Sequence, residues 1–172
     1  MSDGSPFPSS LRREAHASWR FLLTVHAVVV REVDRALREA GCIPFEAYDV
    51  LITLHEAPRG RLRMSDLAGA TLLSHSGISR SVGRLARQGY LKRIRCREDG
   101  RVYHATLTER GKGALHEAWP IYRKVLEELY VEACPDSTAL VMNRFFGRIL
   151  RDYAPERFGT VVEERRTDAP GE

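Results

Sequence analysis

Small residues, hydroxyl groups and arginines are concentrated in one segment, residues 74–84, which reads Ser-His-Ser-Gly-Ile-Ser-Arg-Ser-Val-Gly-Arg. Small side chains let a helix backbone approach a DNA duplex, and hydroxyl groups can hydrogen-bond to bases or phosphates. An arginine can donate two hydrogen bonds to guanine O6 and N7. These properties predict a helix that contacts nucleic acid, and its candidate contact residues are Ser74, Ser76, Gly77, Ser79, Arg80 and Arg84.

A second group of arginines surrounds an Asp-Gly pair further along the chain. Residues 91–96 and 102–108 are rich in β-forming side chains and flank the segment 97–101, Arg-Glu-Asp-Gly-Arg. Asp-Gly between two such runs is a strong signal for a β-hairpin. We expect Arg95, Arg97 and Arg101 to lie near its tip, where a guanidinium group can enter a minor groove or pair with phosphates.

The distribution of charge also indicates a polyanionic partner. The 172 residues carry a formal net charge of +4. Residues 59–112 contain 13 Lys and Arg against four Asp and Glu, a local charge of +9, and the remainder of the chain carries −5. Such a division is typical of a segment that binds nucleic acid. A basic surface that is merely solvated is the alternative explanation.

Hydrophobic periodicity predicts the elements that position these groups. A long helix is expected over residues 12–40, and a second helix should follow Pro44 and end before Pro58. Two short helices, 64–71 with Ser65 as N-cap and 76–88 closed by Gly89, form a helix-turn-helix candidate. The apolar stripe of the long helix, with steps of three and four residues, comprises Trp19, Leu22, Leu23, His26, Val29, Val30, Val33 and Leu37.

Two further helices are expected after the hairpin. Thr108 should cap a helix that starts at Glu109 and that Pro120 should bend. The near-heptad apolar spacing of this helix predicts a seam against another helix. A last helix, about 137–153, should bury Met142, Phe145, Phe146, Ile149 and Leu150.

The predicted fold is mainly α-helical, with an α+β winged helix-turn-helix and long helices on its N- and C-terminal sides. Its parts are a flexible N-terminus (1–11), N-terminal helices (12–57), the DNA-binding region (58–112), C-terminal helices (113–154) and a polar tail (155–172).

Residues 19–150 resemble the MarR (multiple antibiotic resistance regulator) family of winged-helix transcription factors. The most specific part is Ser79-Arg80, Arg84-Leu85, Gln88-Gly89-Tyr90-Leu91 and Arg93, followed by Asp99-Gly100-Arg101 and Leu107-Thr108-Glu109-Arg110-Gly111. The family's Asp-x-Arg wing element precedes Leu-Thr-x-x-Gly at this spacing. The resemblance implies that Asp99 braces the wing by pairing with Arg101 or its neighbours, and that the wing arginine addresses the minor groove.

The same resemblance implies a homodimeric regulator that binds a pseudo-palindromic DNA operator. It also implies a helical dimerisation domain made by the N-terminal helices (12–57, dimerisation and support) and the C-terminal helices (113–154). We expect a repressor, released by a small aromatic acid or phenol. Trp19, His26 and Asp49 are the candidate ligand crevice, since some family members place an acid at the last position beside an effector. Packing of Trp19 and His26 in a core or dimer interface, and a solvent-facing or arginine-paired Asp49, are the alternatives.

The remaining patterns predict no catalysis, metal or cofactor. No nucleophile, phosphate-binding or zinc-ligand motif is present. With no leader and no apolar run long enough to cross a bilayer, we expect a cytoplasmic protein without a membrane partner. Two alternatives remain open: a thiol-based redox sensor using Cys96 or Cys42, and a helical interaction module that does not bind DNA.

Overall fold

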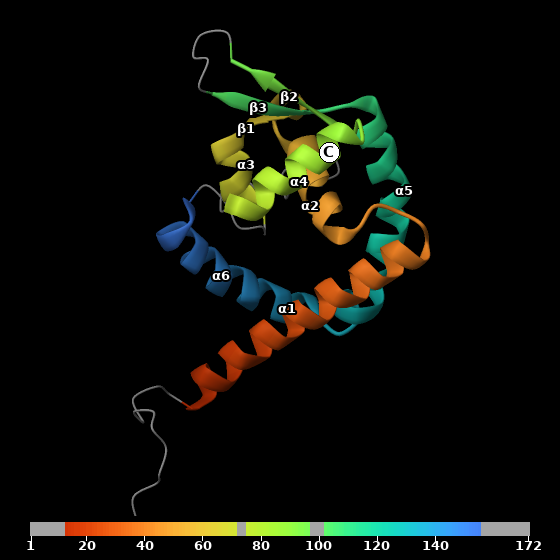
Figure 1. The fold of residues 1–172 in the computed structure, drawn as a ribbon. Coiled ribbons are helices and arrows are strands. Elements are labelled where there is room, and N and C mark those ends of the chain that lie inside the picture. Colours follow the sequence, from red (N-terminus) through yellow and green to blue (C-terminus); the bar gives the residue numbers. More distant parts are fainter. Residues whose placement is uncertain (1–12, 72–74, 97–101, 156–172) are drawn as a thin grey trace, which may run out of the picture.

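The computed structural model describes residues 13–71, 75–96 and 102–155, and it shows a mainly helical chain with one small sheet (Figure 1). Helices α1 and α2 precede the sheet strand β1, and helices α3 and α4 follow it. Strands β2 and β3 then lead into α5 and α6. The bounds are α1 (Arg13–Glu39), α2 (Phe45–Glu56), a 3-10 turn (Pro58–Gly60), β1 (Arg61–Arg63), α3 (Met64–Ala70), α4 (His75–Arg87), β2 (Leu91–Arg95), β3 (Tyr103–Leu107), α5 (Glu109–Leu126), a π-helical turn (Glu127–Val131) and α6 (Asp136–Tyr153).

The three strands form an antiparallel sheet with β3 in the centre, in the order β1-β3-β2. Leu62 of β1 pairs with Ala105, which pairs on its other side with Arg93 of β2. The hairpin of β2 and β3 confirms the prediction, whereas the sequence analysis predicted no strand over residues 61–63. A three-residue strand shows too little alternation to be recognised before its partner strand is known.

The hydrophobic core lies where α2, α3 and α4 meet the inner face of this sheet. Val33 and Leu37 extend the core along the C-terminal half of α1, and Leu115 and Ala118 contribute from α5. Burial of this apolar surface supplies the main driving force that holds α4 against α2. The side chains from the other elements are Val50, Leu51, Leu54, Leu67, Ile78, Val82, Leu85, Leu91, Ala105 and Leu107.

The start of α5 is tied to the end of α4 by one side chain. Thr108 Oγ1 accepts a hydrogen bond from the Gly111 amide at 3.1 Å, as the predicted N-cap should. The same hydroxyl lies 2.7 Å from the carbonyl oxygen of Gly89, which closes α4 with a φ of 79°. The α5 helix continues through Pro120, and the structure assigns helix on both sides of it.

Two predicted features are not as expected. Ser65 does not cap α3: the helix begins one residue earlier, at Met64, and Ser65 Oγ lies 3.0 Å from Asp66 Oδ1. The last helix does not bury its apolar side chains within one chain, because Phe145 is 57% exposed and Ile149 is 42% exposed. Among the described residues, α6 makes few contacts with the rest of its own chain.

The N-terminal half of α1 is also exposed. Trp19 is 55% exposed, and His26 is exposed rather than enclosed in a core. Helices α1 and α6 lie on the side of the molecule opposite the sheet (Figure 1), and α1 packs along α5. The predicted seam therefore exists only in part within one chain, and its outer portion faces solvent.

Candidate nucleic-acid interface

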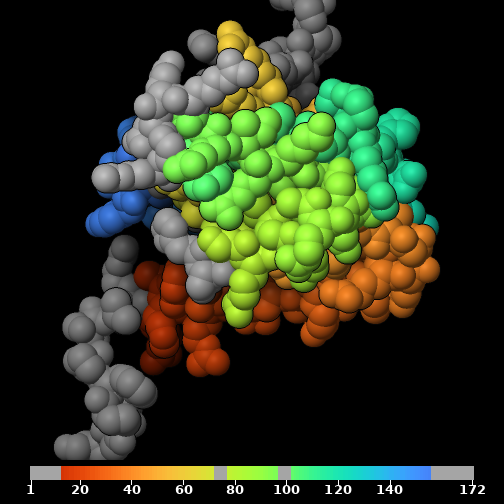
Figure 2. Space-filling model, turned by 45° about the horizontal axis from the view of Figure 1, so that its top comes forward, coloured from red at the N-terminus to blue at the C-terminus, as the bar shows by residue number. Residues whose placement is uncertain are grey.

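Helix α4 is divided lengthwise into a core side and an outer side. Ile78, Val82 and Leu85 are each 1% exposed and face the core. Arg80, Arg84 and Arg87 follow the same spacing of four and three residues but are displaced by two positions, which rotates them by about 200° around the helix. In Figure 2, α4 and β2 occupy the middle of one face of the molecule. The outer residues Ser79, Arg80, Arg84 and Arg87 are all exposed.

One predicted contact residue is held by another part of the protein. Arg84 Nη2 lies 3.2 Å from Glu46 Oε1 at the start of α2. Both side chains keep almost half of their surface exposed, at 45% and 43%. To bind a DNA phosphate, the guanidinium group must therefore either bind both the phosphate and Glu46 or break its ion pair with Glu46.

One basic side chain of the wing lies over an aromatic ring. The guanidinium carbon of Arg93 lies 4.2 Å from the centre of the Tyr103 ring, a cation–π geometry. Arg95 is exposed at the end of β2. Tyr103 was not among our candidates, although a tyrosine two residues after the arginine-rich tip could have indicated a support for the wing.

Several predicted residues lie outside the described part of the chain. They are Ser74, the side chain of Ser76, and the wing residues Arg97, Asp99 and Arg101. Gly77 is half-buried in the first turn of α4. The bracing role of Asp99 stays a prediction.

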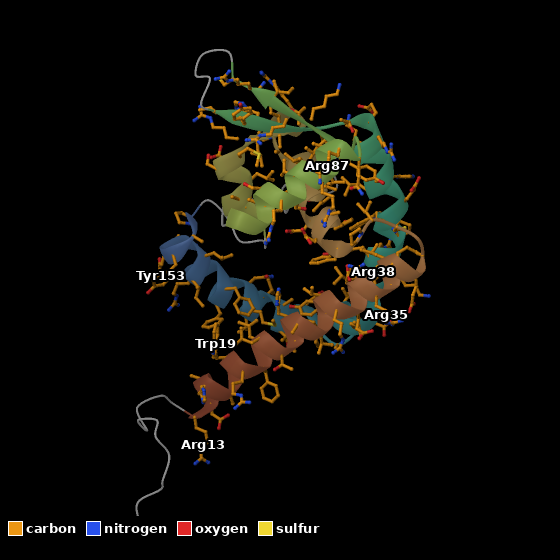
Figure 3. The ribbon with its side chains drawn as sticks, viewed as in Figure 1. Arg13, Trp19, Arg35, Arg38, Arg87 and Tyr153 are labelled. Carbon is orange, nitrogen blue, oxygen red and sulfur yellow. The ribbon has the colours of Figure 1, made fainter. Side chains whose placement is uncertain are left out.

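The three candidate crevice residues are distributed over two helices. Trp19 and His26 are exposed on the N-terminal half of α1, and Asp49 is half-buried on α2. Figure 3 shows Trp19 on the side of the molecule where Tyr153 ends α6, whereas Arg87 lies on α4. The structure does not by itself define a ligand site from these residues.

An aromatic cluster between α2 and α5 is a feature that the sequence analysis missed. The ring of Tyr122 stacks on Tyr48 with centroids 4.7 Å apart, and on Trp119 at 5.9 Å and Phe45 at 6.4 Å. Burial, with the neighbouring Tyr122 and Glu56, raises the pKa of Tyr48 well above its ordinary value, so this hydroxyl stays protonated at neutral pH. Trp119 forms the half-exposed end of the cluster.

The cysteines show no pairing among the described residues. Cys42 Sγ lies 3.7 Å from the carbonyl oxygen of Glu117, and the Cys96 amide donates to the Val102 carbonyl at 2.8 Å in the hairpin. Within the described ranges, no group of three His, Cys, Asp or Glu could hold a metal ion. None of the described helices is both long enough and apolar enough to span a bilayer.

A helix-turn-helix packed on a three-stranded antiparallel wing, with a basic outer side on its second helix, defines a winged-helix DNA-binding protein. Comparison with known protein families gives a match over this region. Residues 43–102 match the model of the MarR family. This match and the fold described above make the protein a MarR-type DNA-binding transcriptional regulator.

Solved structures of regulators agree over most of the chain. Sco3205, a MarR family transcriptional regulator from Streptomyces coelicolor in complex with DNA, is 25% identical with a TM-score of 0.76, covering 88% of this chain and 94% of that one. AbsC from the same organism is 24% identical (TM-score 0.75; 84% and 97% covered). CouR from Rhodococcus jostii, bound to p-coumaroyl-CoA, is 25% identical (TM-score 0.64; 75% and 88% covered). No curated protein sequence matches significantly.

Proposed function

We propose that the protein is a homodimeric repressor that reads a pseudo-palindromic operator and is released by a small aromatic ligand. The observation that carries this proposal is the outer side of α4, where Arg80 and Arg87 are exposed opposite the buried stripe that holds the helix in place and Ser79 is exposed beside them. A helix supported in this way can enter a major groove without losing its packing.

The wing supports the same mode of binding. Arg93 and Arg95 extend from β2 beyond the buried end of the sheet, with Arg93 over Tyr103. Arg97 and Arg101, braced by Asp99, belong to this proposal as the residues that reach the adjacent minor groove. With two-fold symmetry, the half-sites would lie roughly 10 bp apart, which is one turn of B-DNA.

Dimerisation is supported by the apolar side chains that one chain leaves in solvent. Trp19 and Leu23 lie one turn apart on α1 and are at least half exposed, and so are Val141 and Phe145, one turn apart on α6. Contiguous apolar surface of this kind marks a protein interface in soluble proteins. A second copy of the chain would cover both helices at once, because an isologous interface uses the same patch twice.

The proposal of an aromatic effector is supported best by the cluster of stacked rings formed by Tyr122, Tyr48, Phe45 and Trp119. The cluster joins α2, which packs on α4, to α5, which packs on α1. An aromatic ring inserted at its exposed end would change how these helices pack, and therefore the spacing of the two α4 helices. A ligand has this effect only if it binds the two spacings with different affinities. The p-coumaroyl group in CouR is an aromatic ligand of a related protein.

The proposal is tested by selecting DNA with the wild-type protein. Fragments retained from a random-sequence duplex library at a stated salt concentration should share two inverted half-sites. Light scattering of the complex should give two chains per duplex. p-Coumaroyl-CoA and simple phenols would then be screened for release of the selected duplex. Recovery of unrelated sequences at the same affinity would contradict sequence-specific reading.

A further inference from the structure

The three-stranded sheet has an inner and an outer face with different chemistry. On the inner face, Leu62, Leu91, Ala105 and Leu107 meet the core or its margin. Side chains alternate along each strand, and directly paired residues share a face. The pairings therefore place the alternate residues of all three strands together on the outer face.

Two rows of side chains cross this outer face. In the first, Thr106 of β3 lies between Arg61 of β1 and Lys92 of β2. In the second, His104 lies between Arg63 and Ile94. We call Arg61, Arg63 and Lys92 the outer cations; all three are exposed.

Several other arginines and lysines of the described chain form ion pairs with carboxylates, whereas the outer cations do not. Arg35 is paired with Glu39, Arg84 with Glu46 and Lys112 with Glu109. No described carboxylate lies within ion-pair distance of the outer cations. Their charge is therefore not neutralised by the part of the protein that the structure describes.

The polar groups between the outer cations also have few hydrogen-bond partners within the described part of the protein. Thr106 Oγ1 is buried under its neighbours and has no hydrogen-bond partner among the described residues. Arg61 Nη2 lies 3.4 Å from His104 Nε2, a contact between two nitrogen groups that neutralises no positive charge. A buried hydroxyl without a partner costs free energy, which a bound acceptor could recover after a small shift of the side chains above it.

We propose that the outer face of the sheet is a second phosphate-binding surface, which holds the backbone of duplex DNA that flanks the half-site read by α4 of the same subunit. This inference rests on the proposed function. Arg93 and Arg95 belong to the inner face of the same hairpin, so the wing presents cations on both sides. Strands lie about 4.8 Å apart, which separates Arg61 from Lys92 by about 10 Å. That span matches several phosphates of a duplex, which carries one charge per about 1.7 Å of its axis.

Edge protection is the competing explanation of the outer cations. Strands β1 and β2 are the two edges of the sheet, and lysine or arginine on an edge strand discourages pairing with a second molecule. This role predicts association of the protein when the charges are removed, and no effect that depends on the length of the DNA. The two explanations therefore differ in measurable ways.

The test uses two duplexes that carry the same selected site. One duplex, of about 20 bp, covers the two half-sites, and the other is extended by about 10 bp at each end. The full-length wild-type protein is expected to bind the extended duplex more tightly and with a steeper dependence on salt. Replacing two outer cations, Arg61→Gln with Lys92→Gln, should abolish this gain and leave binding to the short duplex within twofold. Each lost phosphate contact lowers the slope of log K against log salt by about 0.9, so the expected change is about 1.8.

Two controls make the outcome unambiguous. Arg31→Gln with Lys124→Gln removes the same charge from exposed positions on α1 and α5, and it should leave the gain from extension intact. Arg61→Lys keeps the charge and should keep most of the gain. Equal losses on both duplexes, or association of the protein with unchanged DNA affinity, would overturn the inference. If the wild-type protein binds no duplex, it is the proposed function that fails.

Discussion

Arg84 Nη2 on α4 lies 3.2 Å from Glu46 Oε1 on α2, so a proposed DNA-contacting arginine is engaged by a carboxylate of its own chain. Exposed ion pairs of this kind contribute about 0–1 kcal/mol to stability. The pair therefore matters less for folding than for the state of Arg84 when DNA arrives, since a phosphate must compete with Glu46 for the same guanidinium group.

Removing the charge of Glu46 should strengthen DNA binding. We expect Glu46→Gln to bind the selected duplex about two- to fivefold more tightly, because at most about 1 kcal/mol of internal pairing no longer opposes the phosphate. The salt dependence should steepen by about one contact. Titrations at several salt concentrations measure both quantities. Glu39→Gln is the matched control, since its partner Arg35 lies on α1, and a weaker complex for Glu46→Gln would show that Glu46 instead positions Arg84 for binding.

Arg80 should read a base rather than a phosphate. It is exposed on the outer side of α4 and has no carboxylate partner among the described residues. Replacing it with Ala should lose about 1–3 kcal/mol on the selected duplex and relax the preference at one base position. Competition assays against duplexes with single base changes measure this preference. An equal loss on random DNA would assign Arg80 to the backbone.

Phe145 should lie in the dimer interface. It is 57% exposed on α6 in one chain, and Phe145→Glu would place a charge where the partner's apolar surface is expected. Light scattering should then report a mass close to that of one chain, and affinity for the two-half-site duplex should fall at least tenfold. Asn143→Glu introduces the same charge on the opposite side of α6 and should stay dimeric. Dimers of Phe145→Glu with unchanged DNA binding would place the interface elsewhere.

Gly111 should not tolerate a side chain. A Cβ atom there would overlap the Tyr90 carbonyl oxygen and lie 2.7 Å from Leu107 Cδ1, at the junction of α5 with the sheet. We expect Gly111→Ala to lower the free energy of unfolding by about 2–3 kcal/mol. Gly113→Ala is the matched control in the same helix, since no atom beyond its neighbours and its own helix backbone lies within 4 Å of its Cβ position. This control should gain about 0.5–1 kcal/mol from helix propensity, and urea unfolding compares the two.

Asp34 should make stability depend on pH. Burial raises its pKa, but hydrogen bonds from the Arg38 side chain and the Phe45 amide outweigh this effect, so the pKa lies below its ordinary value. A carboxyl group with a lowered pKa stabilises the fold at neutral pH, and this contribution is lost as the pH falls through its folded-state pKa. Asp34→Asn should therefore cost about 1 kcal/mol at pH 7.

The difference between Asp34→Asn and the wild-type protein should shrink as the pH approaches 3. Urea unfolding at a series of pH values measures this change. Glu14→Gln alters an exposed carboxylate in the first turn of the same helix, and its effect should be smaller at every pH. A constant difference for Asp34→Asn would show that its effect on stability is steric.

The amino-acid sequence was sufficient to predict features that depend on neighbouring residues. The alternation of buried and exposed positions in α4, the hairpin that follows it, the cap at Thr108 and the closing Gly89 are all confirmed. Each is a local preference of the backbone or a periodicity within one element, so the information lies within a few residues of the feature.

Only the tertiary structure showed which distant groups meet. Strand β1 exists because β3 supplies its hydrogen bonds, and the first turn of α2 is capped by Asp34, a residue of α1. The engagement of Arg84 by Glu46, like the exposure of Phe145, depends on how whole helices pack. Hydrophobic spacing predicts that a side chain will be buried, but it does not say which surface buries it. Phe145 is 57% exposed in a single chain, so the spacing did not distinguish a buried position from an exposed one.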